Sequence, residues 1–344
     1  MRERPIALGV RRLQGQHGQA QDDGHGVTDE DDPTQPAQVD PGTYVAAMQQ
    51  HSVTQSFGSP AIWDRVGRYC VERHLTLPSL RRVLMAGAPV SPPVLERVHR
   101  ILPDCADAHT PYGATEALPV SSITAREVLR ETAALTRAGK GTCVGRPFPG
   151  ITPRVIRITD EVIPAWDERL VLPRGEIGEL VVKGSVITRE YFRRERETAL
   201  AKIKDGDAWW HRMGDVGYLD EQDRIWYCGR KADRVRTASG TLFTDPCEAI
   251  FNQHPHVCRS ALVGIGPAGR QRPVIVIEPQ PGKVPATADE AARFSDELLQ
   301  LGAACPVTVG ISTVLFHRAF PVDVRHNVKI ARDKLALWAA EQAR

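Results

Sequence analysis

Apolar positions are sparse and irregular at the start of the chain and become patterned only near Val45. From Gln14 to Asp40 the residues are mainly Gln, Gly, Asp, His and Pro, with an acidic run at 29–32. Such a segment buries too little apolar surface to offset the entropy lost on ordering. We therefore expect residues 1 to about 40 to be a disordered or unrelated leader.

Short apolar runs and amphipathic stretches alternate from Val53 onward, which predicts an α/β region. Each predicted helix begins at a serine followed by proline, the residue types favoured at a helix start. Ligands of such mostly parallel sheets bind at the carboxyl ends of the strands. The predicted strands are 53–57, 82–86 and 106–110, and the predicted helices run from Ser59 to about His74 and from Ser91 to about Ile101.

The pattern changes after Gly145 to short strands and turns, and again after Gly229 to a mixture of strands and helices. The middle stretch predicts a small antiparallel sheet or barrel. The last predicts an α+β domain. The expected strands are 152–158, 178–183, 216–219, 225–227, 259–265, 274–278 and 311–316, and the expected helices are 246–253, 289–301 and one from Lys329.

The predicted fold class is therefore α/β plus α+β, in three folded parts that follow the leader at 1–40. Residues 41–144 form the α/β part, residues 145–228 a β-rich subdomain, and residues 229–344 a C-terminal α+β domain.

Composition narrows the choice of partners and compartment. A formal charge of +2 gives no general electrostatic case for nucleic acid, and no apolar run could span a bilayer or serve as a signal peptide. The seven cysteines are scattered, odd in number and form no C-x-x-C pair. This pattern favours reduced thiols and a cytoplasmic protein.

The stretch 111–117 (Pro-Tyr-Gly-Ala-Thr-Glu-Ala) carries the most specific chemistry, where a strand is expected to give way to a loop. Tyr112 offers a stacking surface, Gly113 a backbone open to close approach, Thr115 a hydroxyl and Glu116 a hard oxygen ligand. These groups suit a nucleotide with its metal ion. Alone, the stretch is equally well a polar turn at the end of a strand.

Motifs in a fixed order around this stretch resemble the adenylate-forming superfamily of acyl-CoA synthetases, peptide-synthetase adenylation domains and luciferases. The resemblance covers nearly everything from about Asp40 onward. It implies that the C-terminal domain is mobile about a hinge near 229–231. Its motifs are 87–89 (Gly-Ala-Pro), 112–116 (Tyr-Gly-Ala-Thr-Glu), 144–150, 178–184, 210–215 (Trp-His-Arg-Met-Gly-Asp), 229–233 with 246–248, and 321–332.

Three stretches that overlap these motifs, 112–123, 226–231 and 320–327, are most similar to β-lactone synthetases of bacterial long-chain olefin biosynthesis. This resemblance implies that ATP activates a β-hydroxy fatty acid, whose own hydroxyl then closes a four-membered lactone with release of AMP. It implies ATP/AMP and Mg²⁺ as cofactors, and other olefin-biosynthesis enzymes as candidate partners. The alternatives are a fatty-acid–CoA ligase and a catalytically inactive AMP-binding fragment.

The resemblance also assigns roles around the base and the ribose. Tyr112 would stack on adenine, which the backbone of Gly87, Ala88 and Pro89 would wall. Asp215 would accept both ribose hydroxyls, because a carboxylate offers two acceptor oxygens. Arg230 would pair with the ribose–phosphate side.

On the phosphate side, the resemblance makes Thr115 a hydrogen-bond donor to the α-phosphate and Glu116 the magnesium ligand. Lys329 would bridge the substrate carboxylate and the α-phosphate and neutralise charge during adenylation, which is often the largest catalytic effect.

Four features invite other interpretations. Gly214-Asp215 could form an ordinary hairpin turn, and Lys329 could be a solvated lysine near the last helix. His254-Pro255-His256 reads as a turn more than as a metal site. The stretch 237–241 lacks the ending of a phosphate-binding loop, so we reject that role.

The chain departs from the superfamily in three places. No Ser/Thr/Gly-rich loop ending in lysine precedes Gly87, so we expect the chain to correspond to the C-terminal part of an adenylating enzyme. Ala232 replaces the usual hinge Asp or Lys, and Val328 replaces the glycine before the late lysine. The hinge behaviour of the superfamily therefore cannot be assumed for this chain. The sequence also leaves the acyl chain length open.

Overall fold

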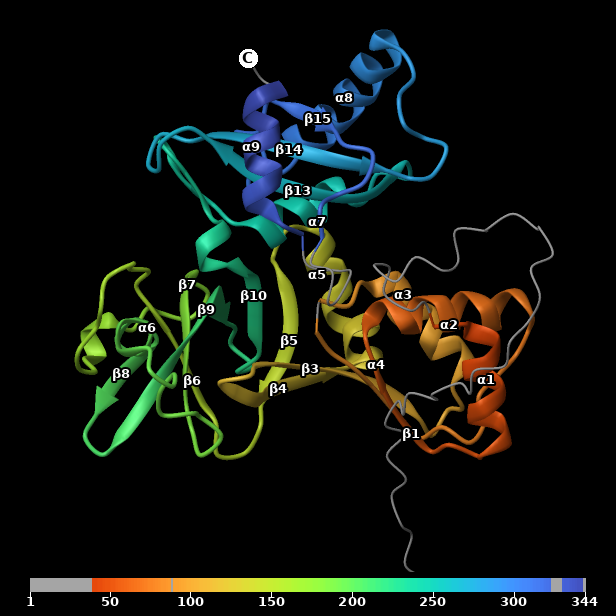
Figure 1. Cartoon of the computed structure of the whole chain (residues 1–344), viewed down its shortest axis with the longest axis horizontal. Helices are drawn as coiled ribbons and strands as arrows, with labels where there is room; N and C mark the ends of the chain where they lie inside the picture. The colour runs from red at the N-terminus through yellow and green to blue at the C-terminus, as the bar shows by residue number, and fades with distance from the viewer. Residues whose placement is uncertain (1–38, 88, 323–329, 343–344) are drawn as a thin grey trace, which may run out of the picture. The chain divides into compact units, whose positions relative to one another are not determined.

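The computed structural model describes residues 39–87, 89–322 and 330–342. The expected leader falls almost entirely outside these residues, as do Ala88 and Lys329 of the predicted site. The described residues belong to one compact unit. Ten of the described strands form one sheet, in the order β1 (Gln55–Gly58), β2 (Arg82–Met85), β3 (Asp107–Ala114), β4 (Ala117–Thr124), β5 (Thr142–Pro147), β10 (Ile225–Arg230), β9 (Ala208–Leu219), β7 (Gly178–Lys183) and β6 (Thr152–Ile156), with β8 (Lys202–Asp205) beside β9 (Figure 1).

The predicted α/β region is confirmed at its start. Strands β1 (Gln55–Gly58), β2 (Arg82–Met85) and β3 (Asp107–Ala114) pair in parallel. Helix α2 begins where expected because the Ser59 hydroxyl accepts the N–H of Ile62 and Pro60 takes the first helical position. Trp63 and other buried side chains of α2 and α3 join those of β2 in one core. The helices are α1 (Pro41–Gln50), α2 (Pro60–Glu72) and α3 (Pro92–Ile101).

The Tyr112 motif does not lie in a loop, as the sequence suggested. Strand β3 continues to Ala114, and only Thr115 and Glu116 form the turn into β4 (Ala117–Thr124), which runs antiparallel to it. The two-residue turn contains no glycine, proline or asparagine to signal a hairpin. A short helical segment follows, made of α4 (Ala125–Glu127), the π-turn Val128–Thr132 and α5 (Ala133–Arg137).

The stretch 144–147, which begins one of the superfamily motifs, belongs to β5 (Thr142–Pro147), which joins the α/β strands to the β-rich ones. Gly145 permits this junction. Its φ is +85°, and a Cβ there would stand 2.0 Å from the carbonyl oxygen of Ser122 on β4. The sheet is therefore continuous from the first strands into the predicted antiparallel part.

The β-rich part contains the expected strands and several others. Strand β9 extends well beyond the four residues expected, so the hairpin-turn interpretation of Gly214-Asp215 is wrong. Helix α6 and strand β8 were not expected. Strand β8 pairs antiparallel with β9. The elements are β6 (Thr152–Ile156), the 3-10 turn Glu168–Leu170, β7 (Gly178–Lys183), α6 (Glu195–Ala201), β8 (Lys202–Asp205), β9 (Ala208–Leu219) and β10 (Ile225–Arg230).

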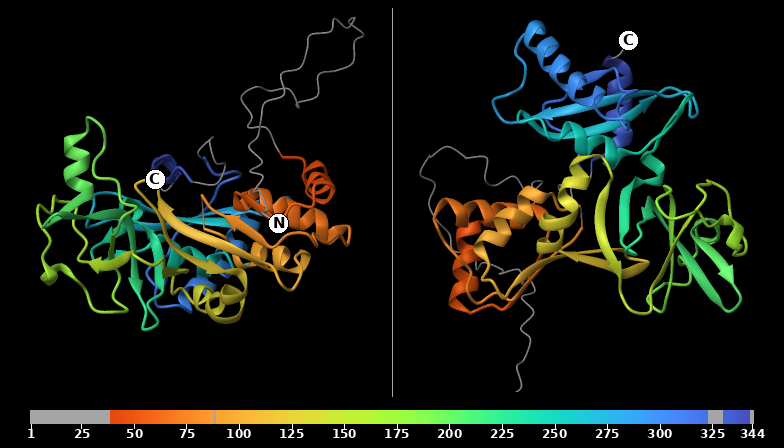
Figure 2. Two further views of the ribbon diagram at one scale, coloured as in Figure 1. Left: turned by 90° about the horizontal axis from the view of Figure 1, so that it is seen from below. Right: turned by 180° about the vertical axis from the view of Figure 1, so that it is seen from behind.

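The C-terminal residues form a three-stranded sheet with helices on both faces, as the α+β prediction requires (Figures 1 and 2). Phe251 of α7 and Leu298 of α8 pack on one face, and Leu335 of α9 packs on the other. The last helix begins at Arg332, three residues later than expected. The elements are the 3-10 turn Lys231–Asp233, β11 (Val235–Thr237), β12 (Gly240–Leu242), α7 (Thr244–Phe251), β13 (Val257–Ile265), β14 (Arg272–Pro279), α8 (Ala288–Ala303), β15 (Val314–Phe316) and α9 (Arg332–Gln342).

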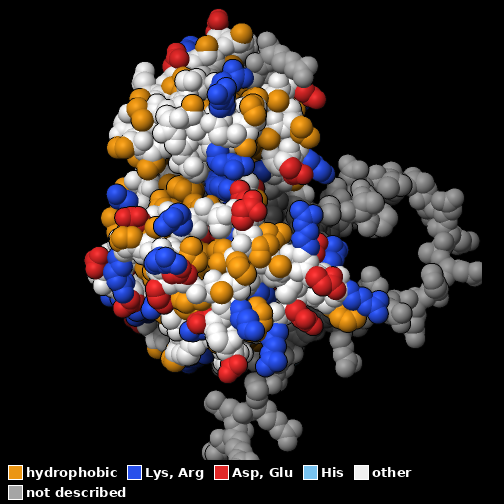
Figure 3. All heavy atoms as spheres, turned by 90° about the vertical axis from the view of Figure 1, so that its left-hand side faces the viewer, with side chains coloured by type: hydrophobic (Ala, Val, Ile, Leu, Met, Phe, Trp, Pro, Cys, Tyr) orange, Lys and Arg blue, Asp and Glu red, His pale blue; other side chains and the backbone are white. Residues whose placement is uncertain are grey.

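On the face that Figure 3 shows, acidic and basic side chains lie interspersed among hydrophobic ones. Within the described ranges, no helix combines the length and the apolar character needed to cross a membrane.

Candidate functional site

Three residues predicted from distant motifs meet at one point. Asp215 on β9 accepts the Tyr112 hydroxyl hydrogen on Oδ2 at 2.6 Å and the Arg230 Nη1 hydrogen on Oδ1 at 2.6 Å. Asp215 is 4% exposed. Burial and the neighbouring Asp215 carboxylate raise the pKa of Tyr112 well above its usual range, so the phenol stays protonated and donates. The three side chains form one hydrogen-bonded group, which we call the Asp215 triad.

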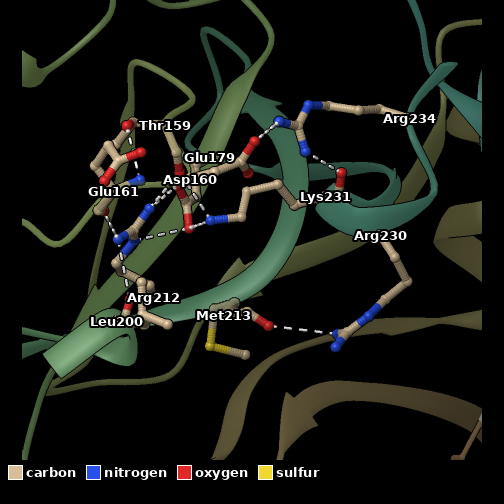
Figure 4. Close-up of polar contacts among 10 residues, drawn as sticks. All are labelled: Thr159, Asp160, Glu161, Glu179, Leu200, Arg212, Met213, Arg230, Lys231 and Arg234. Carbon is tan, nitrogen blue, oxygen red and sulfur yellow. Dashed lines mark hydrogen bonds and ion pairs between the residues drawn. The ribbon is translucent and has the colours of Figure 1, made fainter. Parts of the chain in front are cut away.

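The backbone of β9 and β10 determines this meeting. Arg230 and Asp215 are direct partners in the antiparallel ladder. Gly214, with φ of +68°, precedes Asp215, and a Cβ there would stand 3.3 Å from the Arg230 guanidinium. The same guanidinium lies 3.4 Å from the Met213 carbonyl oxygen (Figure 4). A side chain at Gly214 would therefore disturb the triad.

Glu116 lies in the β3–β4 turn, beside Thr115, and faces residues of the 187–191 segment. Its Oε1 accepts the Tyr191 hydroxyl hydrogen at 2.7 Å, and its carbonyl oxygen accepts the Thr188 N–H at 2.9 Å. Burial raises the pKa of Glu116, but the Tyr191 hydrogen bond and the nearby cations lower it further, so the net shift is downward. The carboxylate is therefore ionised at neutral pH.

The pairing of β3 with β4 requires a glycine at position 113. A Cβ at this position would stand 2.7 Å from the carbonyl oxygen of Ala117, across the hairpin. The glycine is thus needed for the tight β3–β4 pairing, whatever ligand approaches it.

The remaining predicted residues are placed only in part. Gly87, with φ of +98°, and the exposed Pro89 follow the carboxyl end of β2, which neighbours β3. Ala88 and Lys329 lie outside the described residues. A bridge between Val322 and Ile330 joins the chain on either side of the segment that contains Lys329.

A cavity of about 220 Å³ adjoins both parts of the site. Its lining includes Glu116 and Tyr191 on one side and Arg230 on another. His211 also lines it, and the buried Nδ1 of this residue has no hydrogen-bond partner among the described residues. The cavity therefore connects the predicted metal ligand to the Asp215 triad. A second cavity, of about 280 Å³, lies elsewhere and contains none of the predicted site residues.

A buried ionic cluster that the sequence did not predict lines this cavity (Figure 4). Glu179 and Arg212, with side chains 0% and 2% exposed, form a bidentate pair at 2.9 and 2.8 Å. Lys231 donates to Glu179 Oε1 at 2.9 Å and to the carbonyl oxygen of Thr159 at 3.0 Å. Arg212 also donates to that carbonyl, at 2.6 Å. Charged residues inside otherwise apolar strands were the signal that could have revealed it.

Burial affects the pKa of two basic side chains beside Glu116, Lys202 and His211. Burial lowers the pKa of Lys202 to about 8, while Glu116 opposes this shift. Burial, and then the neighbouring Lys202 ammonium, lower the pKa of His211 to about 4. His211 is therefore neutral at pH 7, and it can offer a hydrogen-bond acceptor but no positive charge to the cavity.

Two predicted alternatives can be compared with the structure. His254, Pro255 and His256 form a turn between α7 and β13, as expected, and His254 pairs with Glu297 at 3.0 Å. No cluster of three or more metal-ligating side chains is found in residues 39–87, 89–322 or 330–342. The stretch 237–241 forms the β11–β12 hairpin.

Sequence comparison identifies the family. Residues 32–192 match the family described as AMP-binding enzyme. The chain is 47% identical over 316 residues to the olefin beta-lactone synthetase of Xanthomonas campestris, covering 90% of this chain and 55% of that protein. The chain belongs to the AMP-binding enzyme family. The corresponding protein of Stenotrophomonas maltophilia is 45% identical over the same length.

Two solved structures share the fold. The amide bond synthetase from Marinactinospora thermotolerans superposes with a TM-score of 0.70 at 24% identity, covering 88% of this chain and 55% of that chain. The o-succinylbenzoate CoA synthetase of Bacillus subtilis, solved with ATP and magnesium ion, gives 0.64 at 19% identity, covering 86% of this chain and 54% of that chain. The chain thus spans about half the length of the relatives it matches.

Proposed function

We propose that the chain supplies the AMP-binding side of an adenylate-forming active site, in which the Asp215 triad holds the ribose. The triad is the observation that carries this proposal, because it joins three family motifs at one buried carboxylate. The two oxygens of a carboxylate suit the two hydroxyls of a ribose diol. Tyr112 and Arg230 orient this carboxylate for the diol.

Glu116 fits the role of magnesium ligand. Its carboxylate is ionised, lines the cavity and is held at one oxygen only by Tyr191. Mg²⁺ keeps several waters and commonly takes one or two carboxylates together with substrate phosphates. When bound, the ion would neutralise charge on the phosphates. Thr115, in the same turn, would donate to the α-phosphate.

We further propose that the substrate is a β-hydroxy fatty acid and the product a β-lactone, as the names of the Xanthomonas and Stenotrophomonas relatives suggest. The acid's carboxylate oxygen would join the α-phosphorus as pyrophosphate leaves. The β-hydroxyl oxygen would then bond to the acyl carbon as the bond to AMP breaks, with the hydroxyl proton lost. Lys329 would neutralise the carboxylate in the first step. A cytoplasmic location and contact with other olefin-biosynthesis enzymes stay predictions.

A fatty-acid–CoA ligase is the second candidate, since the chain is 28% identical over 272 residues to a long-chain-fatty-acid–CoA ligase of Thermus thermophilus. The two reactions differ in the acceptor of the acyl group. A chimera that places this chain behind the N-terminal part of the Xanthomonas relative would be given ATP and a β-hydroxy fatty acid. We expect lactone without any thiol; product formed only with coenzyme A would favour the ligase.

The 344-residue polypeptide itself distinguishes the third candidate, an inactive AMP-binding fragment. It contains no Ser/Thr/Gly-rich loop ending in lysine before Gly87. We therefore expect it to bind AMP and to show no ATP–pyrophosphate exchange above background. Robust exchange by this polypeptide would exclude the inactive fragment.

A further inference from the structure

We propose that Tyr191 is a positioning residue, which holds the carboxylate of Glu116 in the orientation that a metal–nucleotide complex requires. The inference rests on the proposed metal role of Glu116 and adds a residue 75 positions away in the sequence. No predicted motif role included Tyr191, which lies before the unexpected helix α6.

The contact itself leaves the carboxylate partly available. The Tyr191 hydroxyl donates to Glu116 Oε1 at 2.7 Å, and no other side chain in the described part of the chain bonds this carboxylate. Both residues line the same cavity. One oxygen is thereby fixed while Oε2 stays available, which suits a ligand that shares a metal ion with water and phosphate.

The segment that carries Tyr191 also holds the backbone of the Glu116 turn. The Thr188 N–H donates to the Glu116 carbonyl oxygen at 2.9 Å, and Ile187 forms a bridge with Ala117. Main chain and side chain of Glu116 are thus held from one segment. The carboxylate has little freedom to turn away from the cavity.

Tyr191 is in turn fixed by the start of α6. Its N–H donates to the Thr198 hydroxyl at 3.0 Å, and its carbonyl oxygen accepts the Arg194 N–H at 3.1 Å. Thr198 also donates its N–H to the Arg194 carbonyl oxygen at 2.9 Å. Groups that orient a metal ligand typically change metal affinity 10–100-fold when they are removed. The bond from Tyr191 therefore has a measurable expected effect.

The test is Tyr191→Phe in the full chain, with Mn²⁺ as the probe because it takes the same oxygen ligands as Mg²⁺ and is paramagnetic. Electron paramagnetic resonance would measure Mn²⁺ affinity in the presence of ATP, and calorimetry would measure metal-free AMP affinity. We expect Mn²⁺ affinity to fall about tenfold, with AMP affinity unchanged. The unchanged AMP affinity would also show that the variant folds.

Two further variants separate the possible failures. Tyr218→Phe is the matched control, because it removes a hydroxyl that donates to the Lys140 carbonyl oxygen at 2.9 Å, away from Glu116. Glu116→Gln tests the metal role itself. If the unaltered chain binds no Mn²⁺ with ATP, or if Glu116→Gln binds it normally, the proposed metal role fails and this inference with it. If Glu116→Gln loses Mn²⁺ but Tyr191→Phe matches Tyr218→Phe, only the inference about Tyr191 is overturned.

Discussion

Tyr112 donates its hydroxyl hydrogen to Oδ2 of Asp215 at 2.6 Å, across 103 residues of sequence. Arg230 holds the other oxygen of the same carboxylate. Asp215 is thus oriented from both sides before any ligand is present. A site whose acceptor is already oriented loses little freedom when a ligand binds.

Breaking the buried Glu179–Arg212 pair should be costly. Arg212→Met leaves the fully buried carboxylate of Glu179 with Lys231 as its remaining cation. We expect the free energy of unfolding to fall by roughly 3–5 kcal/mol, the usual effect of removing one partner of a buried pair. Urea denaturation would measure it.

A surface pair provides the control for that prediction. Arg169 and Asp167 form an ion pair with side chains 90% and 37% exposed. Arg169→Ala should change the free energy of unfolding by less than about 1 kcal/mol. Equal losses in both variants would show that burial does not determine the importance of the Glu179–Arg212 pair.

Asp245 should make stability depend on pH. Burial raises its pKa to about 7, although Thr142 donates to its Oδ2 at 2.9 Å. A raised carboxyl pKa means that the native state holds the proton more tightly than the unfolded state. The stabilisation of the native state by protonated Asp245 is therefore fully present below about pH 4 and is lost as the pH rises toward 7.

Asp245→Asn should remove this dependence, since an amide does not ionise. We expect the variant to gain about 1–3 kcal/mol relative to the unaltered chain between pH 4 and pH 8, as measured by urea denaturation. Asp207→Asn, at an exposed position, is the control. A difference between Asp245→Asn and the unaltered chain that is constant with pH would contradict a raised pKa.

Lys329 should affect chemistry more than binding. In the chimera with the Xanthomonas relative, Lys329→Ala should slow adenylate formation about 100-fold or more, with little change in ATP affinity. The reason is that its charge would meet oxygens that become more negative during adenylation. Single-turnover kinetics would measure the rate; an unchanged rate would make Lys334 the next candidate.

The elements predicted from sequence are those with strong local signals. Ser59-Pro60 and the amphipathic pattern after it determine α2, and Thr287 caps α8 by accepting the Glu290 N–H. Strand β4 was missed because Thr115-Glu116 lacks the residues typical of a hairpin turn. The three-part domain division stays a prediction.

The same holds for the site: residues within a local motif were predicted, and contacts between distant residues were not. Tyr112, Asp215 and Arg230 belong to recognisable motifs, so their residue types could be identified before their contact was known. Glu179 and Arg212 stand 33 residues apart, and Tyr191 stands 75 residues from Glu116. Such pairings depend on strand order in the folded sheet, and no local pattern records them.

AMP binding by Asp215 variants tests the central claim most directly. Isothermal titration calorimetry would compare the unaltered chain, Asp215→Asn and the control Asp223→Asn, which removes an exposed carboxylate paired with Arg174. Loss of charge-assisted hydrogen bonds of about 1.5–3 kcal/mol corresponds to roughly 10–100-fold. We predict that Asp215→Asn weakens AMP binding at least tenfold while Asp223→Asn leaves it unchanged. Equal AMP affinity in Asp215→Asn and the unaltered chain, or no AMP binding by the unaltered chain, would contradict the claim.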